Sequence, residues 1–237
     1  MMKKQEFLQG IKDGMPICLG YFSVSMAFGL SVVLAGMPLW SAVLTSLTNV
    51  TSAGQFAGVN LMLEHAPFVE IFLTTIIINM RYFLMSLSVS QKVSSKMTMG
   101  QRLAVSFGIT DEIFAVSMQK KGELSAIYMF GLILMPVIGW TMGTLTGAVA
   151  TSFMPKALSD AMGIALYGMF IAIIMPDARK EKSVLYTIIM AVAASYAFTY
   201  LPILNKVSSG WVIIIITIAV SAIAATLFPI KVEEEEE

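Results

Sequence analysis

The feature that most constrains this chain is a run of 50 residues, from Gly14 to Leu63, that contains no Asp, Glu, Lys, Arg or His. Charged residues make up 13% of the chain, whereas soluble domains carry about 25%. Other uncharged stretches also reach the roughly 17–25 residues that a helix needs to cross a bilayer; they are Ser125–Pro155, Ser183–Asn205 and Trp211–Ile230. The sequence therefore predicts an all-α polytopic membrane protein.

The centre of this run is small and polar, with Asn49, Ser52, Gly54 and Gln55 in a stretch that should lie at membrane depth. Irregular backbone at that depth is tolerated only where protein or a water-filled cavity satisfies its polar groups. Secondary transporters hold substrates at such broken helices. The alternative is a small-residue helix contact, because Gly54 and Gly58 have GxxxG spacing. Residue types alone leave both interpretations open.

Positive charge decides between two membrane topologies, because Lys and Arg concentrate in cytoplasmic loops. Suppose that the N-terminus is inside, that residues 39–63 dip in and return, and that residues 103–119 do not cross. Then 12 basic residues lie inside and 2 outside; if both segments cross, the split is 9 to 5. The first topology is favoured, with both termini cytoplasmic. It predicts about 6–7 transmembrane helices, with a broken or re-entrant segment near residues 39–63. The unbroken spans are expected at about 14–35, 67–90, 125–150, 161–176, 183–205 and 210–230.

Arg81 is the most informative single residue, since it lies 11 residues into an apolar stretch that starts at Glu70. A charge at the centre of a span costs about 2.5–3.5 kcal/mol on insertion scales, so this arginine needs a partner. A guanidinium can hold a carboxylate with two parallel hydrogen bonds. The partner is either a ligand or a structural one among Glu70, Asp111 and Glu112. Asn79, two residues earlier, should point to a different face of the helix.

Adjacent carboxylates, Asp111 and Glu112, lie in the sequence GITDEIF. Gly108 can break a helix and Thr110 can cap the next one, whose N-terminus the two acids would then favour. That structural account is sufficient by itself. The functional alternative is that one carboxylate carries a proton or binds an ammonium group.

Three glycines in GWTMGTLTG, residues 139–147, form a double GxxxG and predict a tight helix contact. Trp140, within this segment, would either wall a pocket or lie at the membrane interface.

Enzyme signatures are absent. His65 is the only histidine and Cys18 the only cysteine, which excludes a His-based metal cluster and a disulfide. Neither a GxSxG nor a Walker motif is present. The sequence thus predicts no enzyme, metal or cofactor, and its scattered basic residues show no pattern for nucleic acid.

With these motifs, the chain resembles the AzlC family, the large subunit of a bacterial branched-chain amino acid exporter. The resemblance covers nearly the whole chain. Many members read A-G-x-x-Q-F where this chain has Thr51 to Phe56, so the glycine is displaced. The matching segments are FGL at 28–30 with Gly36, SAGQF at 52–56, NMRYFLMSLS at 79–88, FGITDEIFA at 107–115, W-x-x-G-T-x-x-G at 140–147 and ALYGMFIAII at 165–174.

The resemblance implies export of leucine, isoleucine, valine and similar neutral amino acids across the bacterial cytoplasmic membrane. It also implies proton-motive drive and a small AzlD-type membrane subunit as partner. We expect one transporter domain over residues 1–230 and a disordered acidic tail over 231–237.

The transporter hypothesis assigns roles to the polar groups at membrane depth. Arg81 would hold the substrate carboxylate, and Asp111 or Glu112 would meet the amino group or a proton. The alternative is a non-catalytic membrane subunit or a channel for another small zwitterion, in which these charges are structural. The expected substrate-binding residues are Asn49, Ser52, Gly54, Gln55, Asn79, Arg81 and Trp140, and the expected proton-coupling residues are Asp111 and Glu112.

Overall fold

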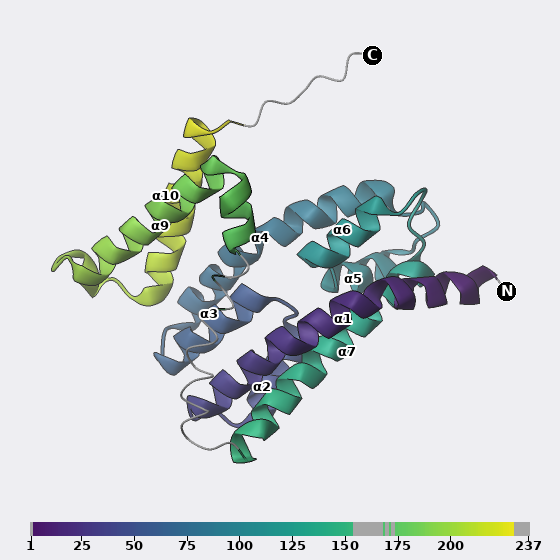
Figure 1. The fold of residues 1–237 in the computed structure, drawn as a ribbon, viewed down its shortest axis with the longest axis horizontal. Helices are drawn as coiled ribbons and strands as arrows, with labels where there is room; N and C mark the ends of the chain where they lie inside the picture. The colour runs from purple at the N-terminus through teal and green to yellow at the C-terminus, as the bar shows by residue number, and fades with distance from the viewer. Residues whose placement is uncertain (1, 154–167, 169–170, 172–173, 230–237) are drawn as a thin grey trace. The chain divides into compact units, whose positions relative to one another are not determined.

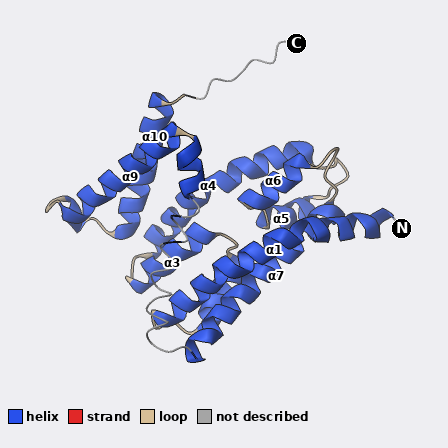
Figure 2. Cartoon of the chain, viewed as in Figure 1, coloured by secondary structure: helices blue, strands red, loops and turns tan. Residues whose placement is uncertain are grey.

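The computed structural model describes residues 2–153, 168, 171 and 174–229, and every regular element in these ranges is helical (Figure 2). The first five helices are α1 (Met2–Leu34), α2 (Leu39–Thr48), α3 (Ser52–Leu63), α4 (Phe68–Lys92) and α5 (Met99–Phe107). They are followed by α6 (Asp111–Gln119), α7 (Ala126–Ala150), α9 (Lys182–Tyr200) and α10 (Ser209–Leu227), with short 3₁₀ turns at Thr151–Phe153 and Leu204–Lys206.

Within the described residues, 5 helices are long and apolar enough to cross a membrane, namely α1, α4, α7, α9 and α10. They coincide with the spans expected near residues 14–35, 67–90, 125–150, 183–205 and 210–230. The prediction of an all-α membrane protein is thus confirmed. The span expected at 161–176 lies largely outside the described residues, and the acidic tail lies wholly outside them.

Helix α1 begins well before the start expected near Gly14, because its polar first turns have partners on α7. The Ser125 hydroxyl donates a hydrogen bond to Glu6 at 2.6 Å, and the Tyr128 hydroxyl donates to Asp13 at 2.9 Å. These contacts extend the α1–α7 pairing beyond the apolar part of α1.

The GxxxG glycines of residues 139–147 form the predicted tight helix contact. Its partner is α1, and Figure 1 shows α1 and α7 side by side. A Cβ atom added at these glycines would lie 2.4, 2.2 and 1.9 Å from the carbonyl oxygens of Cys18, Phe22 and Met26 respectively. Any larger residue would therefore push the two backbones apart, which is how small residues permit close helix packing in membranes.

Two segments contain broken helices. Residues 49–51 separate α2 from α3, and residues 108–110 separate α5 from α6. The break expected within 39–63 is therefore present, and a second one interrupts 103–119. The second break has the predicted cause, because α5 ends at Gly108 and Thr110 caps α6 by accepting a hydrogen bond from the Ile113 amide.

The chain leaves α4 and enters α7 at the same end of these helices. The Ser94 amide donates to the Leu124 carbonyl, and the Leu124 amide donates to the Lys92 carbonyl, both at 2.9 Å. If the α5–α6 segment crossed the membrane once, Lys92 and Ser94 would lie on the opposite side from Leu124, about 30 Å away. The α5–α6 segment therefore returns to the side from which it starts, as in the favoured topology.

The same reasoning applies to the first broken segment. Because Glu6 near the start of α1 contacts Ser125 at the start of α7, α1 begins at the end where α4 finishes. If α1 and α4 each cross once, the α2–α3 segment must also return to the side from which it enters.

The chain divides into two compact units, one of Met1–Val59 and Asn79–Tyr167, the other of Asn60–Ile78 and Gly168–Glu237. A single transporter domain over residues 1–230 stays a prediction. In the first unit, α1 and α7 form the central pair and contact α2, α5 and α6. In the second unit, α9 packs against α10.

Glu70 forms its hydrogen bonds within the second unit. Its side chain is 3% exposed and accepts hydrogen bonds from the Ser208 hydroxyl at 2.5 Å and the Trp211 amide at 3.2 Å. These donors lie at the N-terminus of α10, where a carboxylate is favoured by unpaired amides and the helix dipole. A structural role accounts for this buried acid.

Candidate functional site

The first tip, residues 49–55, comprises the break between α2 and α3 and the first turn of α3. Asn49 ends α2 with its backbone amide bonded to the Thr45 carbonyl at 2.8 Å. Gly54 lies directly against Asn79 of α4, since a Cβ atom at this glycine would lie 2.7 Å from the Asn79 Nδ2 atom. The displaced glycine of the sequence thus lets α4 bring an amide side chain to the tip.

Gln55 is the centre of a buried hydrogen-bond network in the first tip. Its side chain is 1% exposed, and its Oε1 atom accepts from the Ser46 hydroxyl at 3.3 Å and from the Trp140 indole N–H at 3.2 Å. The Ser46 hydroxyl also lies 2.7 Å from the Thr144 hydroxyl. Trp140 is therefore buried inside the protein and does not lie at the membrane interface.

Polar atoms at the first tip remain unpaired. Ser52 Oγ, Gln55 Nε2 and Asn79 Oδ1 are buried and have no hydrogen-bond partner among the described residues. A buried polar group left unsatisfied costs about 1–3 kcal/mol. Donors and an acceptor gathered at one break in a membrane-depth helix therefore suit a polar ligand or bound water.

The second tip, residues 108–112, comprises the break between α5 and α6 and the first two residues of α6. Asp111 and Glu112 occupy the first turn of α6, so its dipole favours both carboxylates. Ile109, between the two helices, is 4% exposed and belongs to the hydrophobic core. The backbone of this tip is therefore anchored by packing while its acids extend from the helix start.

Arg81 of α4 forms an ion pair with the second tip. Its Nη1 atom lies 3.1 Å from Asp111 Oδ2, and its Nη2 atom donates to the Tyr82 hydroxyl at 3.1 Å. The side chains of Arg81 and Asp111 are 49% and 40% exposed. Of the three acids considered from the sequence, Asp111 is the partner. The described part of the chain therefore leaves this ion pair only half-buried.

Helix α4 contacts both tips through residues that point to different faces. Asn79 lies against Gly54 of the first tip, whereas Arg81 pairs with Asp111 of the second. The sequence separates these two residues by one position, and the structure gives each a different partner.

Tyr21 of α1 links the two tips and was not among the predicted site residues. Its hydroxyl donates to the Glu112 carboxylate and lies 2.7 Å from Thr110 Oγ1. Its ring meets the edge of the Trp140 ring, with centroids 5.1 Å apart, and Trp140 in turn donates to Gln55. A continuous set of contacts thus joins the neutral tip to the charged one.

Sequence reasoning also missed Ser46 and Thr144, which hold the first tip to α7. Ser46 is an ordinary small residue of an apolar helix, and nothing local distinguishes it. Thr144 lies one residue after Gly143 in the predicted tight contact, so that contact was the available signal. The described residues contain no group of three His, Cys, Asp or Glu side chains that could hold a metal ion.

The sequence matches one known family over the part of the chain that builds this site. Residues 16–154 match the family described as AzlC protein, a range that contains both tips, Tyr21, Arg81 and Trp140. No solved structure matches the chain significantly.

Several curated relatives are membrane proteins. The chain is 25% identical over 188 residues to the inner membrane protein YgaZ of Escherichia coli, covering 76% of this chain and 77% of that one. It is 28% identical over 184 residues to an uncharacterized membrane protein of Archaeoglobus fulgidus, covering 76% and 79%. A Helicobacter pylori membrane protein is 26% identical over 185 residues, covering 75% and 80%.

Proposed function

Because the chain belongs to the AzlC family, we propose that it is a secondary active transporter subunit that exports leucine, isoleucine, valine and similar neutral amino acids. Its membrane-spanning helices and membrane-protein relatives support a transport-related role. We place it in the bacterial cytoplasmic membrane with both termini cytoplasmic, from the distribution of Lys and Arg. A small AzlD-type membrane subunit would be its partner.

The observation that carries the proposal is the meeting of two broken helices around α4. One break offers unpaired amide and hydroxyl groups from Ser52, Gln55 and Asn79. The other presents the half-exposed Arg81–Asp111 pair. Broken helices that present polar groups at membrane depth are the substrate sites of many secondary transporters.

The ion pair has the charges needed to recognise a zwitterion. A substrate carboxylate would bind Arg81 in place of Asp111, and the substrate ammonium would bind the released Asp111 carboxylate. Every charge then remains paired, whereas a simple anion would leave Asp111 without its partner. This balance favours a free amino acid over a carboxylic acid of similar size.

The remaining predicted residues would act around this exchange. Gln55 and Ser52 would supply hydrogen bonds at the first tip, and Asn49 and Gly54 would shape its backbone. Glu112, held by Tyr21, is the candidate proton carrier. Movement of the second tip as Arg81 exchanges Asp111 for the substrate would open the site toward one side of the membrane while it remains closed toward the other.

Leucine efflux tests the proposal. Cells that lack their own exporters would be loaded with a leucine-containing dipeptide, with and without this protein, each together with its small partner. We expect faster efflux that an uncoupler abolishes and that an Arg81→Ala variant of normal abundance loses. Arg179→Ala, an exposed arginine of the second unit, is the matched control.

Two results would contradict this function. Unchanged efflux of leucine, isoleucine, valine and methionine would exclude the substrate class. Loss of protein abundance without loss of turnover per molecule in the Arg81→Ala variant would support the non-catalytic subunit instead.

A further inference from the structure

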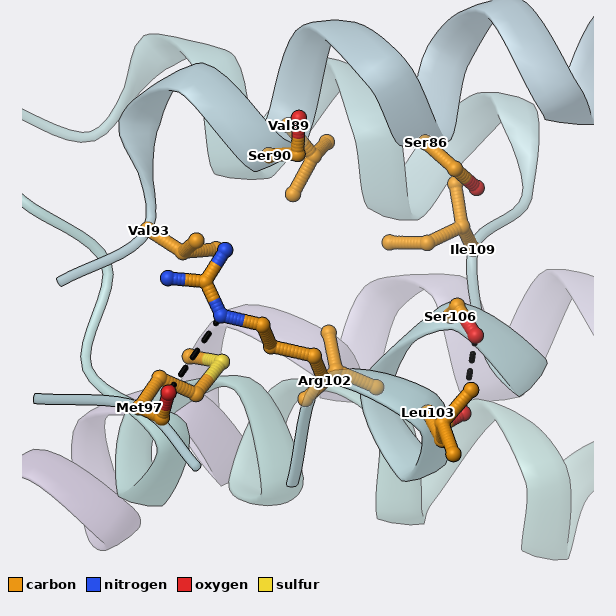
Figure 3. A pocket seen from close by; sticks show the side chains of 10 residues that line it. Ser86, Val89, Ser90, Val93, Met97, Arg102, Leu103, Ser106 and Ile109 are labelled. Atoms are coloured by element: carbon orange, nitrogen blue, oxygen red, sulfur yellow. Dashed lines mark hydrogen bonds between the residues drawn. The ribbon is translucent and has the colours of Figure 1, made fainter. Parts of the chain in front are cut away.

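A hollow of about 190 Å³ lies between the end of α4 and helix α5 and reaches Ile109 of the second tip (Figure 3). Its deeper wall is formed by core side chains, among them Val89, Met97 and Ile109, which are 3%, 6% and 4% exposed. Leu103 on its rim is 65% exposed. The hollow is smaller than the about 300–1,000 Å³ of sites that enclose a whole small ligand, so it suits one part of a longer molecule.

Arg102 extends across this hollow. Its Nε atom donates to the Met97 carbonyl at 3.3 Å, and Figure 3 shows the two terminal nitrogens turned toward Val93. Among the described residues, no carboxylate forms an ion pair with this guanidinium. The terminal nitrogens are thus positioned to bind an anion at the edge of an apolar surface.

The surrounding chain is positive. Residues 71–110 contain no Asp or Glu but include Lys92, Lys96 and Arg102 near the hollow. Lys92 is engaged, since its ammonium donates to the Ser117 and Met118 carbonyls. Lys96 is exposed. Arg102 and Lys96 therefore supply the local positive charge.

Two of the three serines that line the hollow are hydrogen-bonded within their own helices. The Ser106 hydroxyl donates to the Leu103 carbonyl at 2.8 Å and the Ser90 hydroxyl to the Leu87 carbonyl at 2.6 Å. Both donors are satisfied by their own helices, which leaves Arg102, Ser86 and the apolar side chains to define the chemistry of the hollow.

We propose that this hollow is a binding site for one anionic phospholipid of the leaflet at which α4 ends. The phosphate would bind Arg102, and the adjoining apolar part of the lipid would lie against Val89, Val93 and Ile109. A free phosphate ion would use the arginine but gain nothing from this wall. Basic pockets beside membrane helices select anionic headgroups in the same way.

Native mass spectrometry of the full chain in detergent tests this site, with equimolar phosphatidylglycerol and phosphatidylcholine as probes. We expect the wild type to retain one phosphatidylglycerol in preference to phosphatidylcholine, because Arg102 and the exposed Lys96 would repel the choline ammonium that offsets the phosphate charge of phosphatidylcholine. Arg102→Ala should lower that retention roughly fivefold, and Arg102→Lys should keep most of it. Arg179→Ala, which removes an exposed arginine elsewhere, should change nothing.

A second variant separates the charge from the hollow. Ser106→Phe fills the rim without changing charge, so it should lower retention of phosphatidylglycerol while the protein elutes and unfolds like the wild type. The proposal is overturned if the wild type retains both lipids equally, or if Arg102→Ala and Ser106→Phe both retain phosphatidylglycerol at the wild-type level.

Discussion

The two broken segments use the same backbone device for different chemistry. In the first tip, residues 49–55, the key side chain is neutral, and Gln55 is 1% exposed. In the second tip, residues 108–112, the key side chains are charged, and Asp111 is 40% exposed. The break in each helix frees polar backbone and side chains. Burial permits only hydrogen bonding in the first tip, whereas the half-exposed ion pair of the second tip would allow the charge exchange that we propose.

The two segments also occupy matching places in the chain. Helices α5, α6 and α7 start at residues 99, 111 and 126, which is 60, 59 and 58 residues after α2, α3 and α4 start at 39, 52 and 68. Each series is a broken pair followed by a long helix. Since a returning pair does not cross, the long helices α4 and α7 run in opposite directions, which is the arrangement of an inverted repeat.

The largest expected effect concerns the charged tip. Arg81→Ala should lower leucine efflux by at least about tenfold, because removing one partner of a hydrogen-bonded ion pair costs about 2–5 kcal/mol when buried and less when half-exposed. Efflux per molecule, normalised to abundance, is the measurement. Efflux equal to that of the wild type would remove Arg81 from the mechanism.

A glycine comparison tests the neutral tip. In Gly54→Ala the new Cβ would lie 2.3 Å from Thr51 Oγ1 and 2.7 Å from Asn79 Nδ2, so overpacking should cost about 1–3 kcal/mol and lower the melting temperature. Gly100→Ala in α5 is the matched control, since nothing lies within 4 Å of its Cβ position. Equal melting temperatures for the two variants would contradict the close approach of α4 to the first tip.

The pH dependence of efflux distinguishes the tips. Gln55→Leu removes the acceptor of the Ser46 and Trp140 hydrogen bonds and should lower efflux several-fold at every pH, because an unsatisfied buried donor costs about 1–3 kcal/mol. Glu112→Gln replaces an ionisable group and should instead flatten the pH profile. A flattened profile in Gln55→Leu, or an unchanged one in Glu112→Gln, would reverse the roles assigned to the two tips.

The smallest effect is expected at the link between the tips. Tyr21→Phe keeps the ring against Trp140 but removes the hydroxyl from Glu112, at a cost of about 0.5–1.5 kcal/mol. A double-mutant cycle with Glu112→Gln, read as efflux per molecule, should be non-additive because the two groups are in contact. Additive effects would show that this hydrogen bond does not connect α1 to the second tip.

Several features could be predicted from the sequence because they depend on local composition. Uncharged runs of spanning length located the long helices, and Gly108 with Thr110 located the second break. The glycines of residues 139–147 indicated a tight contact before its partner was known. For the first break, the amides and glycine of residues 49–55 allowed either a broken or a continuous helix, and only backbone geometry decided.

The sequence by itself determined that this chain lies in a membrane, where the 5 long apolar helices of the described residues fall and that Arg81 needs a partner. It could do so because the free-energy cost of a charge in hydrocarbon depends on the residue itself. Only the tertiary structure decided that the partner is Asp111 and that Tyr21 and Trp140 join the two tips. Those contacts connect residues far apart in the chain. They depend on how the helices pack together, which a local sequence pattern does not reveal.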